Sequence, residues 1–102
     1  MRTLLARKQL LGKWKSDTDD PPTQVNYGDV TQTFHEDGRL TYIIRSPEKD
    51  RVVRLVYTID GDELVTDQPS APAEHRTKVS FDERGRLILD DRGERSRFIR
   101  VK

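Results

Sequence analysis

Apolar residues recur in short alternating runs along this chain, and each run is bounded by residues that favour turns. Alternation with a period of two is typical of strands that bury one face and expose the other. The pattern predicts eight strands, at residues 12–16, 28–35, 39–46, 51–59, 62–67, 74–82, 86–91 and 94–101. Strands at such even spacing, with no long helical pattern between them, indicate an antiparallel sandwich or barrel.

A short helix is predicted ahead of the first strand, over residues 4–11. Thr3 is suited to cap its beginning, and Gly12 follows at the position where a helix favours a left-handed residue. The segment 17–27 contains Pro21 and Pro22 and is predicted to be a loop.

Tight turns that contain glycine allow the strand pairing to be predicted. They are the three-residue loops at 36–38 and 83–85 and the two-residue turn at 60–61. With the loop at 47–50, they predict the pairs Phe34–Leu40, Gln32–Tyr42, Val30–Ile44, Phe81–Leu87, Val79–Leu89, Tyr57–Leu64, Tyr42–Leu55 and Ile44–Val53. A two-residue turn at 92–93 pairs Leu87 with Phe98, whereas a three-residue loop would turn the other face of the last strand inward. The first choice places the larger apolar residues on one common face.

The connections differ in length at the two ends of this predicted sheet. The longer loops 17–27, 47–50 and 68–73 share one end with the short turn 92–93, and the tight glycine turns share the other. Closing the sheet would remove the exposed edges of its first and last strands. We therefore predict an all-β protein, an up-and-down antiparallel barrel of about eight strands with an open mouth at the loop end. Residues 1–102 are expected to form one such domain.

A short motif links the two ends of the chain. Gly12-Lys13-Trp14 follows the short predicted helix, and Arg100 lies late in the last strand. This arrangement resembles the N-terminal signature of the lipocalin (calycin) superfamily, in which the tryptophan lies at the closed end of the barrel beneath a late arginine. The resemblance implies a lipocalin-like barrel with Trp14 and Arg100 as its closing structural pair. In length, the chain is most similar to small bacterial lipocalin-like domains, many of which have no assigned function, and a shallow cup is implied.

The inward-facing positions divide into two zones. Near the tight turns they form a predicted core of Trp14, Phe34, Leu40, Tyr57, Ile59, Leu64, Phe81, Leu87 and Phe98. Toward the mouth, polar residues alternate with aliphatic ones, as in small-molecule sites. The candidate ligand-binding residues of the lumen and mouth are Tyr27, Gln32, Tyr42, Ile44, Val53, Thr66, His75, Thr77 and Ser96.

These positions favour a non-catalytic protein that binds a small, partly apolar molecule in the barrel lumen, oriented by Tyr42, Gln32 and His75. An eight-stranded barrel can hold one small ligand or be filled by its own side chains. The alternative is therefore a solidly packed barrel that acts as a protein-interaction or structural module. A patch for a partner or a weak homodimer would consist of the outward aliphatic residues Ile43, Val52, Val56 and Val65, with Ile88 a further outward aliphatic residue.

Composition narrows the function classes. The net charge of +1 provides no field that favours nucleic acid or an acidic membrane. The absence of cysteine excludes disulfides, thiol catalysis and thiolate metal sites. His75 has no second histidine or carboxylate at a metal-ligand spacing, so no metal, haem or other cofactor is expected. The sequence contains no phosphate loop or nucleophile elbow, no apolar run that would span a membrane and no secretory leader pattern, so we expect a non-enzymatic cytoplasmic protein.

Overall fold

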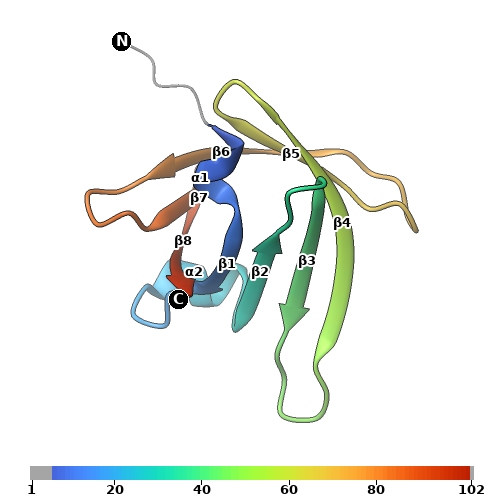
Figure 1. Ribbon diagram of the computed structural model, residues 1–102. Helices are drawn as coiled ribbons and strands as arrows, with labels where there is room; N and C mark the ends of the chain where they lie inside the picture. Colours follow the sequence, from blue (N-terminus) through green and yellow to red (C-terminus); the bar gives the residue numbers. More distant parts are fainter. Residues whose placement is uncertain (1–5, 102) are drawn as a thin grey trace.

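The computed structural model describes residues 6–101, which form two short helices and eight strands. In chain order these are α1 (Arg7–Leu10), β1 (Gly12–Ser16), α2 (Pro21–Asn26), β2 (Val30–Phe34), β3 (Arg39–Ile44), β4 (Arg51–Asp60), β5 (Glu63–Asp67), β6 (His75–Phe81), β7 (Leu87–Asp91) and β8 (Glu94–Val101). Each strand pairs antiparallel with the next, and β1 pairs with β8, so the sheet closes into a barrel (Figure 1). The predicted eight-stranded up-and-down barrel is confirmed.

Three hairpins have the predicted register. The confirmed pairs are Val30–Ile44, Gln32–Tyr42, Phe34–Leu40, Val79–Leu89, Phe81–Leu87 and Leu87–Phe98. Gly38 and Gly85 have φ values of 91° and 76°, a region that other residues rarely adopt. The turn chemistry therefore sets which side chains face the interior.

The register of β4 differs from the prediction on both of its sides. The predicted pairs Tyr42–Leu55, Ile44–Val53 and Tyr57–Leu64 are wrong. The structure pairs Leu40–Leu55, Tyr42–Val53, Ile44–Arg51, Tyr57–Thr66 and Ile59–Leu64 instead. Strand β4 continues to Asp60, so the turn lies at residues 61–62, and the preceding connection spans 45–50. Each shift is two residues, which keeps every side chain on its predicted face.

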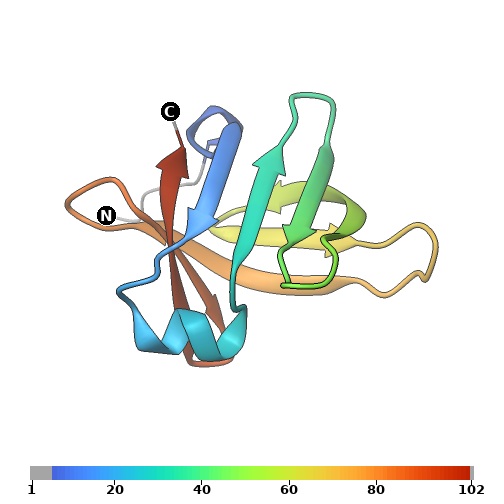
Figure 2. The same cartoon turned by 90° about the horizontal axis from the view of Figure 1, so that it is seen from below.

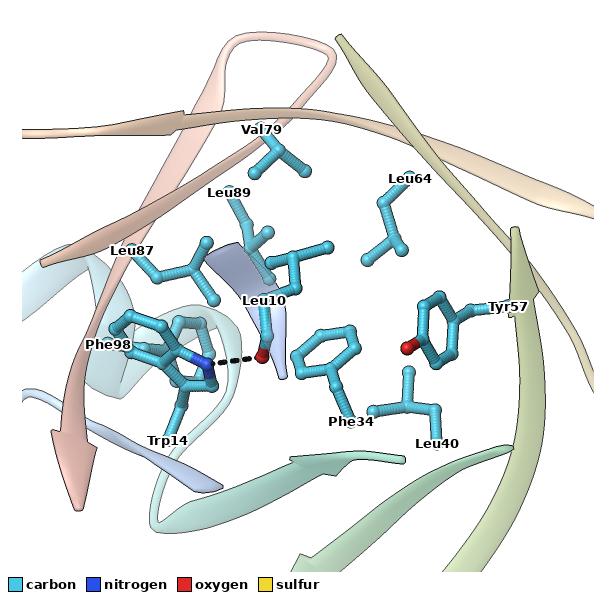
Figure 3. Packing of buried hydrophobic residues seen from close by; sticks show 10 residues of the cluster. All are labelled: Leu10, Trp14, Phe34, Leu40, Tyr57, Leu64, Val79, Leu87, Leu89 and Phe98. Carbon is cyan, nitrogen blue, oxygen red and sulfur yellow. Dashed lines mark hydrogen bonds between the residues drawn. The ribbon is translucent and has the colours of Figure 1, made fainter. Parts of the chain in front are cut away.

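Helix α1 closes the end of the barrel that carries the tight turns. The predicted helix 4–11 is confirmed over Arg7–Leu10, whereas Thr3 and residues 4–5 lie outside the described residues. Leu10 is fully buried. Figure 3 shows it at the centre of a ring of core side chains contributed by the surrounding strands.

The second helix occupies the segment that was predicted to be a loop. Pro21 and Pro22 stand in the first turn of α2, where a missing backbone N–H leaves no helical hydrogen bond unmade. Figures 1 and 2 show α2 at the end of the barrel opposite α1. The prolines therefore begin a helix and do not prevent one.

The apolar core lies toward the α1 end. It consists of Leu10, Trp14, Phe34, Leu40, Tyr57, Leu64, Val79, Leu87, Leu89 and Phe98 (Figure 3). The predicted core is confirmed at seven of these positions, while Ile59 and Phe81 are only partly buried against it. The core includes residues from all eight strands and from α1.

Trp14 and Arg100 join the first strand to the last. The indole Nε1–H of Trp14 donates to the carbonyl of Leu10 at 2.9 Å. The Arg100 guanidinium carbon lies 4.2 Å from the centroid of the Trp14 ring. The same guanidinium donates to the carbonyls of Leu11 and Gln9, each at 2.8 Å. The predicted contact is confirmed, and stacking of this kind contributes roughly 0.5–2 kcal/mol.

We expect Gly12→Ala to destabilise the barrel more than Gly61→Ala does. Gly12 has a φ of +110°, and a Cβ there would lie 3.0 Å from the Arg100 guanidinium. Gly61 also has a positive φ, +65°, but a Cβ there would meet nothing within 4 Å. Both substitutions introduce backbone strain of order 1–3 kcal/mol, and only the first also displaces Arg100. If urea unfolding shows that both variants lose the same free energy of unfolding, the close approach of Arg100 to Gly12 does not add to the cost of the substitution.

Candidate functional site

The end opposite α1 is open beside strand β4. This strand pairs with β3 over residues 51–56 and with β5 over residues 56–60, so residues 51–55 have a partner strand on one side only. A groove of about 540 Å³ lies between this part of β4 and the β5–β6 loop. Val53, which faces inward opposite Tyr42, is half-buried and lines the groove. Inward-facing side chains therefore reach solvent at this opening.

Helix α2 is fastened to β8 at the end of the barrel opposite α1. The hydroxyl oxygen of Thr23 accepts the backbone N–H of Arg97 at 2.6 Å. The Asn26 amide donates to the hydroxyl of Ser96 at 3.0 Å. These bonds join residues more than 60 positions apart and hold α2 across one side of the open end (Figure 2).

A buried carboxylate anchors the segment that leads into α2. The side chain of Asp17 is 3% exposed, and the Arg97 guanidinium donates to it at 2.7 Å. Burial alone would raise the pKa of Asp17. The hydrogen bonds from the Asp19 N–H and from Arg97, with the charges of Arg97 and Arg86, outweigh burial, so the pKa is lowered. The ionised form of Asp17 is thus favoured in the folded protein.

Two tyrosines and one carboxylate follow one another around the interior near α2. The ring of Tyr27, the C-cap of α2, packs edge-on against Phe98 at 5.1 Å. Burial raises the pKa of Tyr27, and the negative charge of Asp91 raises it further. Burial likewise raises the pKa of Tyr42 well above its usual range, and Tyr27 adds to the effect. Both hydroxyls are therefore neutral donors at physiological pH.

Gln32 is a fully enclosed polar residue in this region. It faces inward opposite Tyr42 and is 0% exposed. Its Nε2 and Oε1 atoms have no hydrogen-bond partner within residues 6–101. Leaving a buried polar group unsatisfied costs about 1–3 kcal/mol, so this amide calls for a polar partner.

His75 and Asp91 lie together at the rim. The side chain of His75 is exposed, and its Nε2 lies 3.0 Å from Oδ2 of Asp91. The other carboxylate oxygen, Oδ1, is buried and has no partner in the described part of the chain. Asp91 is not among the candidate binding residues predicted from the sequence. It shares the inward parity of Leu87 and Leu89, a signal that could have identified it.

The other predicted ligand-binding residues divide by depth. Thr77 and Ser96 are buried, and Ser96 already accepts the Asn26 amide. Half-buried positions nearer the opening are Ile44, Val53 and Thr66. The structure therefore brings Gln32, Tyr42 and Tyr27 into one interior region, places His75 on its rim and adds Asp91 and Asn26, which the sequence prediction missed.

The outward aliphatic residues do not form one uniform patch. Ile43 and Val52 are cross-strand partners, and Val52 is 54% exposed. Ile88 is only 8% exposed and lines a hollow of about 290 Å³ together with Pro22 of α2. The position of α2 thus explains why Ile88 is buried. The aliphatic side chains on the outer face of β3 and β4 are not covered by it.

Within residues 6–101, no group of three His, Cys, Asp or Glu side chains is arranged to hold a metal ion. None of the helices in the same part of the chain has the length and apolar character needed to cross a membrane. Comparison with protein-family models, with curated proteins and with solved structures found no match to this chain.

We expect Asp17→Asn to lower the free energy of unfolding at pH 7 by about 1.5–3 kcal/mol, because a charged hydrogen bond to Arg97 is lost. The pKa of Asp17 is lowered in the folded protein. Its stabilisation is therefore complete above the ordinary carboxyl pKa of about 3.9 and disappears as the pH falls through the folded value. Urea unfolding at pH 7 and near pH 3 should show the difference from the wild type shrinking in acid. Asp19→Asn, at an exposed neighbour, is the control, and a difference independent of pH would refute this account.

We expect Gln32→Met to raise the stability of the free protein. The substitution keeps the length of the side chain and removes an amide without partners among residues 6–101, a gain of about 1–3 kcal/mol. For a domain of this size, each kcal/mol corresponds to roughly 4–8 °C in the melting temperature. Gln24→Met is the matched control, because the Gln24 amide donates to the Asp17 carbonyl at 3.0 Å and its removal should destabilise. A lower melting temperature for Gln32→Met would mean that the amide is already satisfied.

Proposed function

We propose that this protein binds a small, partly apolar molecule in the barrel lumen, with no catalytic step. The observation that carries the proposal is the Gln32 amide, which is enclosed and has no partner among the described residues. A donor and an acceptor side by side suit a hydroxyl or amide group of a ligand. The neutral hydroxyls of Tyr42 and Tyr27 would add donors, and His75 would orient the ligand at the rim.

The surroundings of Gln32 match the usual composition of small-molecule sites. Val53 lies opposite Tyr42, Ile44 ends β3 two residues beyond Tyr42, and both aliphatic side chains are half-buried. Apolar walls with a few convergent polar groups bind ligands by burial and fix their orientation by hydrogen bonds. The groove beside β4 offers a route of entry.

We also propose that the barrel is lipocalin-like. Three features support this: the Gly-x-Trp motif directly after a short helix, the arginine stacked on that tryptophan, and the up-and-down order of the eight strands. The Gly12 contact supplies a physical reason for the motif, since a larger residue there would collide with Arg100.

The test uses 2-phenylethanol as a probe, because it combines one apolar ring with one hydroxyl. We expect its titration into isotope-labelled protein to shift NMR amide signals of β2, β3 and the residues after α2, with saturation. Gln32→Met and Tyr42→Phe should each weaken binding by about three- to tenfold, the loss expected for one hydrogen bond. His75→Ala should weaken binding less, because its side chain is exposed.

Thr33→Val is the control for these variants. Thr33 is the neighbour of Gln32 on β2 and points to the outer face, so binding should be unchanged. Shifts confined to the outer face of β3 and β4 around Val52 would favour the alternative function, a packed barrel that meets a partner through its aliphatic surface. If neither Gln32→Met nor Tyr42→Phe changes the affinity, the proposed binding site in the lumen is also contradicted.

A further inference from the structure

One carboxylate oxygen at the rim of the lumen, Oδ1 of Asp91, has no hydrogen-bond donor within residues 6–101. Asp91 ends β7 and shares the inward parity of Leu87 and Leu89. The Nε2 atom of His75 lies within hydrogen-bond distance of Oδ2 of Asp91. The other carboxylate oxygen, Oδ1, is buried and has no hydrogen-bond partner within residues 6–101. A carboxylate oxygen accepts hydrogen bonds and cannot donate while ionised. A guest that satisfies it must therefore present a donor.

This carboxylate belongs to the same interior region as the Gln32 amide. Gln32 is opposite Tyr42 in the β2–β3 register. Tyr27 packs edge-on against Phe98, which lies opposite Leu87 on the same inward face of β7 as Asp91. The amide and the carboxylate thus both face the barrel interior, with Asp91 at the end of its strand.

The cross-strand neighbour of Asp91 is another acid, and Arg92 follows Asp91 in the turn. Glu94 stands directly opposite Asp91 in the β7–β8 register, which adds a second acid at this side of the rim. On the inward faces of β6, β7 and β8 the only arginine is Arg100, which stacks on Trp14 at the closed end. Arg51, opposite Ile44 on β4, lines the groove together with Arg54, and these cations could instead attract an acidic ligand.

We infer that the ligand class of this lumen is a small apolar amine, whose protonated nitrogen donates to Oδ1 of Asp91 while its apolar body enters toward Gln32. The inference rests on the proposed function and adds the charge of the ligand to it. A hydrogen bond between an ammonium group and a partly enclosed carboxylate is stronger than one between neutral groups. The amine should therefore bind more tightly than an alcohol of the same shape.

Three probes with the same ring test the inference: 2-phenylethylamine, 2-phenylethanol and 3-phenylpropanoate. Binding of each to the full chain is measured by NMR titration at constant pH and ionic strength. We expect the amine to bind about tenfold or more tightly than the alcohol, and the carboxylate to bind most weakly. Asp91→Asn should remove the preference for the amine over the alcohol.

Asp90→Asn is the matched control. Asp90 precedes Asp91, faces outward and pairs with Arg95 across the strands, so the variant removes the same charge from the other face. The amine preference should survive it. Equal loss in both variants would mean that only the net charge matters, and would overturn the inference.

The outcomes separate this inference from the proposed function. If the alcohol binds at Gln32 but the amine binds no more tightly, or if Asp91→Asn leaves the preference intact, the amine inference fails and the lumen site stands. If 3-phenylpropanoate binds more tightly than the amine, the amine inference also fails, because a cation such as Arg51 would then select the ligand. If none of the three probes shifts the signals of β2 and β3, the proposed function itself fails.

Discussion

Trp14 and Arg100 stack on each other where the first and last strands of the barrel pair. An antiparallel meander leaves its first and last strands as edges unless they pair, and here the two residues face each other across the β1–β8 pair. The indole donates to the carbonyl of Leu10, and the guanidinium covers the indole and binds two further carbonyls of the N-terminal segment. One cluster therefore pairs the strands and seats α1.

Most of the fold follows from local turn chemistry. Glycines with positive φ at the tight turns, combined with a side-chain period of two, predict which residues face inward without any knowledge of tertiary contacts. The same rules placed β4 two residues away from its true register on both sides. Gly61 is compatible with the turn at 60–61 or at 61–62, and only the packing of the whole strand decides between them. Because both offsets are even, the predicted core survived the error.

The candidate site was less predictable, because its parts come from segments that are distant in the chain. Helix α2 has a weak local pattern, and its position depends on bonds from Thr23 and Asn26 to β8. Asp91 follows another aspartate at a turn, so its sequence context resembles ordinary turn chemistry. Its inward direction could be deduced from the register, but its bond to His75 and its buried oxygen depend on how β6 and β7 meet. The face of the sheet on which a residue lies can thus be predicted from the sequence. Whether its polar atoms find hydrogen-bond partners depends on the tertiary packing.

The enclosed Gln32 amide lowers the stability of the protein for as long as it has no hydrogen-bond partner. Small domains are stable by only about 5–15 kcal/mol, so an unsatisfied donor and acceptor together would consume a substantial fraction of that margin. A guest that satisfied the amide, either water or a ligand, would recover this free energy. Buried water usually makes about three hydrogen bonds, so a water molecule at Gln32 would need further polar partners beside the amide. A ligand with a polar head and an apolar body would satisfy the amide and could also cover aliphatic side chains such as Ile44 and Val53, which are half-buried.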